Sequence, residues 1–215
     1  MIKHHLPDEV LMAYSAGNLP EAFNVVVASH VSMSDDSRVR LDTYDALGGA
    51  VLDTIETVEM SEGSLEATLA MIERTAVDAI TTEPRTLKPG VFPTPLQDYV
   101  GGDIDDVSWR PVGMGVKQAI LKTSKSATVR LLYIPSGVAM PDHSHGGMEM
   151  TLVLKGAFED EVDHFARGDV EIADEDVHHT PVAVGPEDCI CLSATDARLK
   201  FKSLLPRLAQ PFLQI

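Results

Sequence analysis

The stretch 137–156, GVAMPDHSHGGMEMTLVLKG, determines how we interpret the second half of the chain. His143 and His145 are two residues apart, so in a strand their imidazole rings project from the same face. The glycine pair 146–147 lets the chain bend before Glu149 returns a carboxylate toward those rings. The stretch therefore predicts part of a metal site carried by β-strands.

A fourth metal ligand has to come from another strand, and His178 and His179 are the candidates. Neighbouring residues of a strand face opposite ways, so only one of these imidazoles can point inward, and periodicity leaves the choice open. Three imidazoles and one carboxylate suit a borderline divalent ion such as Zn²⁺, Fe²⁺, Mn²⁺ or Ni²⁺. The alternative is a surface loop whose histidines bind nothing; the regular spacing favours the metal site.

The two halves of the chain differ in hydrophobic period. Residues 1–82 show helical spacing, as in the i, i+4 pair Phe23 and Val27, and short connections predict a small helical bundle. The segment 83–97 contains four prolines and no amphipathic pattern, which is typical of a linker. Residues 98–215 carry short apolar or alternating runs separated by turns, which predicts an antiparallel sandwich or barrel. We therefore expect an α plus all-β, two-domain chain.

The composition is that of a soluble protein in a reducing compartment. The 215 residues contain only two cysteines and no apolar run near the ~20 residues that span a bilayer. The N-terminus lacks the apolar segment of a secretory signal, so we expect a cytoplasmic protein. The net charge of −16 disfavours direct nucleic-acid binding. Residues 1–82 carry −10 of that charge, which would steer them toward a basic protein partner, although acidic surfaces also simply aid solubility.

The two cysteines, Cys189 and Cys191, share one face of a predicted strand. The simpler interpretation is that both are small apolar residues of the barrel interior. The sharper hypothesis is a thiol pair that senses oxidants near the metal. A pair on one strand forms an intramolecular disulfide poorly without rearrangement.

The spacing in 137–156 matches the first cupin motif, G-x5-H-x-H-x3-E-x6-G, without a gap, and predicts a cupin β-barrel for residues 98–215. Beyond this motif, segments along almost the whole chain resemble ChrR-type anti-sigma factors. They are the helical start with His5, SHVSMSDDSR at 29–38, DVSWRPVGMGVKQAIL at 106–121, HTPVA at 179–183, DCICLSATDARL at 188–199 and SLLPRLAQPFL at 203–213.

This resemblance implies a cytoplasmic regulator. Its helical domain would sequester an extracytoplasmic-function sigma factor and cover the surfaces that bind RNA polymerase. Its cupin-like domain would respond to singlet oxygen and related oxidants by releasing the sigma factor. The resemblance also implies one Zn²⁺ in the cupin, with ligands falling on His143, His145, Glu149 and His179, and it thereby selects His179 over its neighbour.

The chain departs from this family at a second zinc site. The family pattern of a distant N-terminal histidine followed by H-x3-C-x2-C falls here on His5, His30, Ser34 and Ser37. Neutral hydroxyls are poor zinc ligands, and two histidines alone do not hold a structural tetrahedral site. His30 also lies on the apolar stripe of its helix, which favours a core histidine. We expect either that the N-terminal domain folds without zinc or that the serines were engineered in place of cysteines.

Two functions of different classes follow. The first is the anti-sigma regulator, with the metal-bound cupin as sensor and a small molecule as a compatible additional ligand. The second is a cupin metalloenzyme, such as a dioxygenase or isomerase, because a three-histidine, one-glutamate site leaves coordination positions open. The sequence names no general base for such an enzyme, and a barrel fold alone does not imply catalysis.

Overall fold

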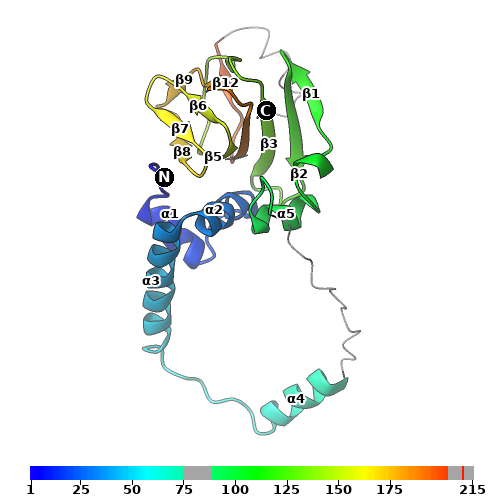
Figure 1. Cartoon of the computed structure of the whole chain (residues 1–215). Helices are drawn as coiled ribbons and strands as arrows, with labels where there is room; N and C mark the ends of the chain where they lie inside the picture. Colours follow the sequence, from blue (N-terminus) through cyan, green and yellow to red (C-terminus); the bar gives the residue numbers. More distant parts are fainter. Residues whose placement is uncertain (75–88, 203–209, 211–215) are drawn as a thin grey trace.

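A computed structural model describes residues 1–74, 89–202 and 210 of the chain, and it confirms the predicted fold class of helices followed by antiparallel sheets (Figure 1). The described helices are α1 (Asp8–Ser15), α2 (Glu21–Met33), α3 (Asp35–Leu52), α4 (Ser64–Arg74), α5 (Thr94–Val100) and the 3-10 helix η1 (Ile104–Asp106). The described strands are β1 (Arg110–Gly113), β2 (Val116–Leu121), β3 (Thr128–Ile134), β4 (His143–Ser144), β5 (Glu149–Lys155), β6 (Ala157–Glu159), β7 (His164–Ala166), β8 (Val170–Ala173), β9 (His178–His179), β10 (Val182–Val184), β11 (Cys189–Thr195) and β12 (Lys200–Phe201).

The described strands pair into three antiparallel sheets. The largest has six strands in the order β1-β2-β3-β11-β5-β8, and two three-stranded sheets have the orders β10-β6-β7 and β12-β4-β9. Val116 of β2, Phe158 of β6 and His143 of β4 line one common cavity. The three sheets therefore enclose a single interior, as expected of a cupin barrel.

The central strands β5 and β11 are buried on both faces, which explains their nearly continuous apolar sequences. On one face, Leu152 and Leu192 belong to the core that the sheet shares with the helices. On the other face, Thr151 and Ser193 line the interior cavity. Side chains along these strands thus alternate between the apolar core and the cavity.

Helix α2 packs directly on the large sheet and contacts β3, β5 and β11. Phe23 and Val26 of α2 lie in one apolar core with Leu131 and Leu192 of the sheet. Helix α5 begins inside the stretch 83–97, directly after Pro93. It ends at Gly101, which has the left-handed conformation at φ 86°. Residues 75–88 lie outside the described part of the chain, and the division into helical domain, linker and cupin domain stays a prediction.

Helices α3 and α4 are the exposed part of the helical half. Helix α3 is capped by Ser34, whose hydroxyl accepts a hydrogen bond from the backbone N–H of Ser37 at 3.2 Å. Figure 1 shows α3 extending away from the sheets and α4 lying apart from them. No residue of α4 is buried. Among the described residues, no helix combines the length and apolar character needed to cross a membrane.

Candidate metal centre

The cupin histidines come from two short paired strands. Strand β4 pairs with β9 so that His143 stands opposite His179, and His145 follows directly after β4. All three imidazoles are buried, with exposed fractions of 6%, 2% and 2% for His143, His145 and His179. His178, the neighbour in β9, is exposed. The strand pairing therefore turns one of the two adjacent histidines inward, which periodicity alone could not choose.

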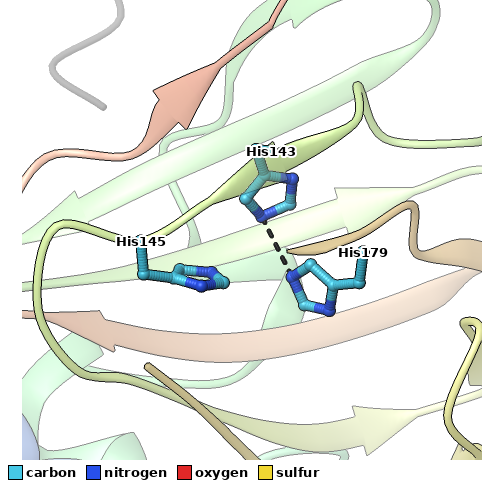
Figure 2. Close-up of side chains that lie close together, drawn as sticks. All are labelled: His143, His145 and His179. Carbon is cyan, nitrogen blue, oxygen red and sulfur yellow. Dashed lines mark hydrogen bonds between the residues drawn. The ribbon is translucent and has the colours of Figure 1, made fainter. Parts of the chain in front are cut away.

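The ring nitrogens converge on one point (Figure 2). One nitrogen of each of the three histidines lies within 4.8 Å of the other two, which makes the group able to hold a metal ion. His143 Nε2 is 3.2 Å from His179 Nε2. Glu149, the first residue of β5, places Oε2 3.2 Å from His145 Nε2. The four residues that the sequence singled out thus lie together.

Each imidazole is anchored through Nδ1, which leaves Nε2 for the centre. His143 Nδ1 donates to the carbonyl of Pro141 at 2.8 Å, and His145 Nδ1 donates to that of Asp174 at 3.2 Å. His179 Nδ1 lies 2.9 Å from Glu171 Oε1 and 3.0 Å from Asp160 Oδ2. Such partners fix both the ring orientation and the tautomer of a metal-binding histidine.

Glu149 is likewise anchored through one of its two side-chain oxygens. Its Oε1 accepts hydrogen bonds from Ser193 at 2.8 Å and Thr151 at 3.0 Å. Its Oε2 and His145 Nε2 are buried and have no hydrogen-bond partner within the described part of the chain. Buried polar atoms are nearly always hydrogen-bonded, and these two atoms have only their 3.2 Å contact with each other, which leaves both able to bind a ligand. A divalent cation fits this donor set of three nitrogens and one oxygen.

The metal-free centre combines an ionised carboxylate with imidazoles of different charge. Burial disfavours the ionised form of Glu149, but the neighbouring imidazoles of His145 and His143 outweigh it and lower its pKa to about 2. Burial lowers the pKa of His143, which keeps that ring neutral. The His179 pKa rises to about 9, because Glu171 and Asp160 outweigh the effect of burial. Burial raises the Glu171 pKa to about 6.

Asp160 and Glu171, which hold the His179 ring, were not singled out from the sequence. Asp160 follows β6, and Glu171 lies in β8 within a run that the sequence indicated only as a strand. The pair forms, with His179, a second group whose geometry suits a metal ion. The available signal was Glu171, a carboxylate within an otherwise apolar strand. Burying such a group without a partner is costly, so its position indicates that a partner lies nearby.

The N-terminal residues also come together, but as a closed hydrogen-bond chain. His5 Nδ1 lies 3.2 Å from Ser34 Oγ, Ser34 Oγ donates to Ser37 Oγ at 3.2 Å, and Ser37 Oγ lies 2.8 Å from His30 Nε2. His30 Nδ1 donates to the carbonyl of Gly168 in the β7–β8 turn at 2.9 Å. Burial lowers the His30 pKa to about 4, so this ring is neutral at pH 7. Two neutral hydroxyls take the place of zinc-binding thiolates, and the donor set does not fit zinc.

The cysteines lie on the cavity side of β11. Cys189 and Cys191 are buried, and their sulfur atoms are 3.4 Å apart. The contact with Cys189 and burial raise the pKa of the Cys191 thiol well above its usual value. A protonated, buried thiol is a weak nucleophile, so this geometry agrees with the apolar packing role. Cys191 lines the interior cavity, so this thiol is the one that the cavity can expose to an oxidant.

Comparisons with known proteins extend these findings. Residues 97–198 match the family described as the ChrR cupin-like domain. The chain is 51% identical to the anti-sigma-E factor ChrR of Cereibacter sphaeroides, over all of this chain and 99% of that protein. It is also similar to ChrR in the crystal structure of Rhodobacter sphaeroides SigE in complex with that anti-sigma factor. This second match has 49% identity and a TM-score of 0.80, over 91% of this chain and all of that one.

Proposed function

Since this chain belongs to the ChrR family of anti-sigma factors, we propose that it sequesters an extracytoplasmic-function sigma factor in the cytoplasm. Its cupin barrel holds one Zn²⁺ through His143, His145, Glu149 and His179, and this part of the chain is the sensor whose response to oxidants releases the sigma factor. The observation that carries the proposal is a 51% identity that spans the helices and the barrel together. A shared barrel alone would support the fold and nothing more.

The exposed helices support a protein partner. Leu65, Leu69 and Ile72 form an i, i+4, i+7 stripe on α4, with exposed fractions of 65%, 50% and 60%. The end of α3 adds exposed Val51 and Leu52. An apolar stripe of this kind on an exposed helix is the usual anchor for docking into a groove of a partner protein.

The metalloenzyme alternative is not favoured by any observation. The two similar proteins carry the names of regulators, and one was crystallised with its sigma factor. The metal centre has open room beside it, which a sensor that binds a small molecule also requires.

The test is co-expression of the full chain with each extracytoplasmic-function sigma factor of the same genome. We expect one of them to co-purify and to lose transcription activity with core RNA polymerase in vitro. Leu65→Asp combined with Leu69→Asp should weaken the complex by about a hundredfold, since two buried apolar anchors are lost. Ala67→Asp adds a charge on the opposite face of α4 and serves as the matched control. Failure of every sigma factor to co-purify would contradict the proposal.

Release is tested on the same complex. Adding an oxidant should free the sigma factor from the zinc-loaded chain but less so from the His143→Ala variant. If the Cys189→Ser, Cys191→Ser double variant releases the sigma factor normally, the thiol pair is not the sensor, and its role is packing.

A further inference from the structure

The β7–β8 turn, residues 167–169, is where the first residues of the chain meet the barrel, and Figure 1 shows the N-terminus beside β8. Asp169 of this turn has an exposed fraction of only 2%. Its Oδ1 accepts hydrogen bonds from the backbone N–H groups of Lys3 at 2.6 Å and His4 at 3.0 Å. Its Oδ2 accepts one from the N–H of Ala166 at 2.9 Å. One buried carboxylate therefore ties the start of the chain to the barrel through charge-assisted hydrogen bonds.

His4 adds three further contacts to this junction. Its carbonyl accepts a hydrogen bond from the backbone N–H of Val170 at 3.1 Å. Its ring packs on that of Phe165 in β7, with centroids 4.5 Å apart, and its Nε2 lies 3.1 Å from Asp163 Oδ2. Residues 3–4 are thus held by backbone and side-chain contacts together.

Helix α2 and Ile2 reach the same turn. The buried His30 of α2 donates from Nδ1 to the carbonyl of Gly168 at 2.9 Å. Gly168 has φ 92°, and a Cβ at this position would lie 2.7 Å from the Ile2 side chain. Both the backbone conformation and the close approach therefore require glycine here. We call the arrangement in which residues 2–4 and His30 contact the turn the docked state.

The same turn leads directly to the metal centre. Glu171, the second residue of β8, lies 2.9 Å from His179 Nδ1 through its Oε1. It follows Asp169 by two residues, a span of about 7 Å in extended chain. Strand β8 pairs with β5, with Glu171 opposite Thr151. One short strand thus carries the partner of a proposed zinc ligand, and the turn before it carries the attachment of the helical half.

This arrangement makes zinc binding and docking depend on each other. A hydrogen-bond partner such as Glu171 orients a metal-binding histidine, and its loss usually costs 10- to 100-fold in metal affinity. When the turn separates from residues 2–4 and His30, the start of β8 loses the contacts that fix it, so Glu171 is held less firmly against His179. Zinc therefore has the higher affinity for the docked state and shifts the equilibrium toward it.

We propose that the β7–β8 turn couples the zinc occupancy of the barrel to the docking of the helical half. Zinc favours the docked state, and loss of docking weakens zinc binding by the same factor, because such coupling is reciprocal. Asp169 is a positioning residue in this scheme, since it acts through Glu171. The inference rests on the metal centre of the proposed function and names the contact by which its state reaches the helices. It does not depend on the sigma factor.

The first test is amide hydrogen exchange, measured by NMR on the full chain with zinc bound and after treatment with a chelator. The amides of Lys3 and His4 should exchange about tenfold more slowly with zinc bound, at the low end of the range for such a partner. Val91 and Phe92 provide the matched control. Their amides donate to Asp103 at 2.8 and 2.9 Å, a similar pair of hydrogen bonds outside the barrel, and should change by less than about twofold.

The reciprocal test is zinc affinity, measured by competition with a zinc-binding dye. Asp169→Asn places an amide at the carboxylate that holds the N-terminal segment, and it should weaken zinc binding by about tenfold. His4→Ala should weaken it by about threefold, since only part of the docking contact is lost. Asp103→Asn is the control and should bind zinc as the natural chain does. If Asp169→Asn does not fold, His4→Ala decides the question, because it changes no residue of the barrel.

Two results would overturn the coupling while leaving the metal centre in place. One is zinc uptake that slows exchange at Lys3 and His4 no more than at Val91 and Phe92. The other is a zinc affinity that neither Asp169→Asn nor His4→Ala changes. A natural chain that takes up no zinc would contradict the metal centre and the coupling together, and the zinc content of the sample separates this failure from the other two.

Discussion

The molecule contains two clusters of histidines, one in the barrel and one in the helical half, and they differ in how their donor atoms are used. In the barrel, His145 Nε2 and Glu149 Oε2 are buried without a hydrogen-bond partner in the described chain. In the helical half, His30 has a partner at both ring nitrogens, and one of these partners is Ser37. The barrel cluster therefore has atoms available to bind an ion, whereas those of the N-terminal cluster are engaged in a hydrogen-bond chain.

This difference shows that the convergence of side chains alone does not make a metal site, because the chemical identity of the donor atoms also matters. The barrel histidines and His30 are buried, His5 is partly buried, and both clusters contain histidine rings that lie close together. Replacing two thiolates by hydroxyls changes ligands into ordinary donors and acceptors, so the same geometry becomes a structural network. We therefore expect one zinc ion per chain, in the barrel.

The largest expected effect is the loss of zinc affinity when a ligand of the barrel cluster is removed. His143→Ala removes one of four ligands and should weaken zinc binding by about a thousandfold or more, since structural zinc sites depend on all their ligands. Competition with a zinc-binding dye measures this loss. His178→Ala, at the exposed neighbour in β9, is the matched control and should bind zinc as the natural chain does. Equal affinity in both variants would contradict the ligand set.

The second effect is the pH dependence of the metal-free chain. The folded pKa of His179, about 9, lies above the unfolded value of about 6.5. This group therefore contributes stability that is fully present below pH 6.5 and is lost as the pH rises through 9. The contribution is about 3 kcal/mol, from 1.36 kcal/mol per pKa unit. Urea unfolding of chelator-treated chain should show the loss between pH 7 and 9.5, and His179→Gln should show none.

The third effect tests the carboxylates behind His179. Glu171→Gln removes an acceptor that orients the ring and should weaken zinc binding by about 10- to 100-fold, the usual cost of such a partner. Glu159→Gln, at an exposed position of β6, should leave the affinity unchanged. An unchanged affinity in Glu171→Gln would mean that Asp160 alone positions the ring.

The smallest effect concerns the N-terminal network. Ser37→Ala leaves the buried His30 Nε2 without a partner and should lower the free energy of unfolding by about 1–2 kcal/mol. Ser61→Ala, in an exposed segment, should change it by less than about 0.5 kcal/mol. A loss of zinc in Ser37→Ala would contradict the hydrogen-bond interpretation of this cluster.

Local patterns predicted much of the fold and of the centre. The first three cupin positions could be read from the sequence because two glycines and a two-residue spacing fix them within one short stretch. The start of α3 was predictable for the same reason, since the Ser34 cap acts on a backbone N–H three residues away.

Contacts between distant segments could not be predicted. Asp160 and Glu171 meet His179 only because β6, β8 and β9 lie around one interior. The His30 contact with Gly168 joins residues 138 positions apart, and no local period signals it. Likewise, the packing of α2 on the sheet follows from an apolar face that a bundle or a sheet would bury equally well.

The most direct test of the account is the number of zinc ions per chain, measured by elemental analysis on the full chain and on the Ser34→Cys, Ser37→Cys double variant. We expect one zinc ion in the natural chain and two in the variant, because the thiols restore four converging ligands with His5 and His30. Two tightly held zinc ions in the natural chain, or a variant that still holds only one, would contradict it.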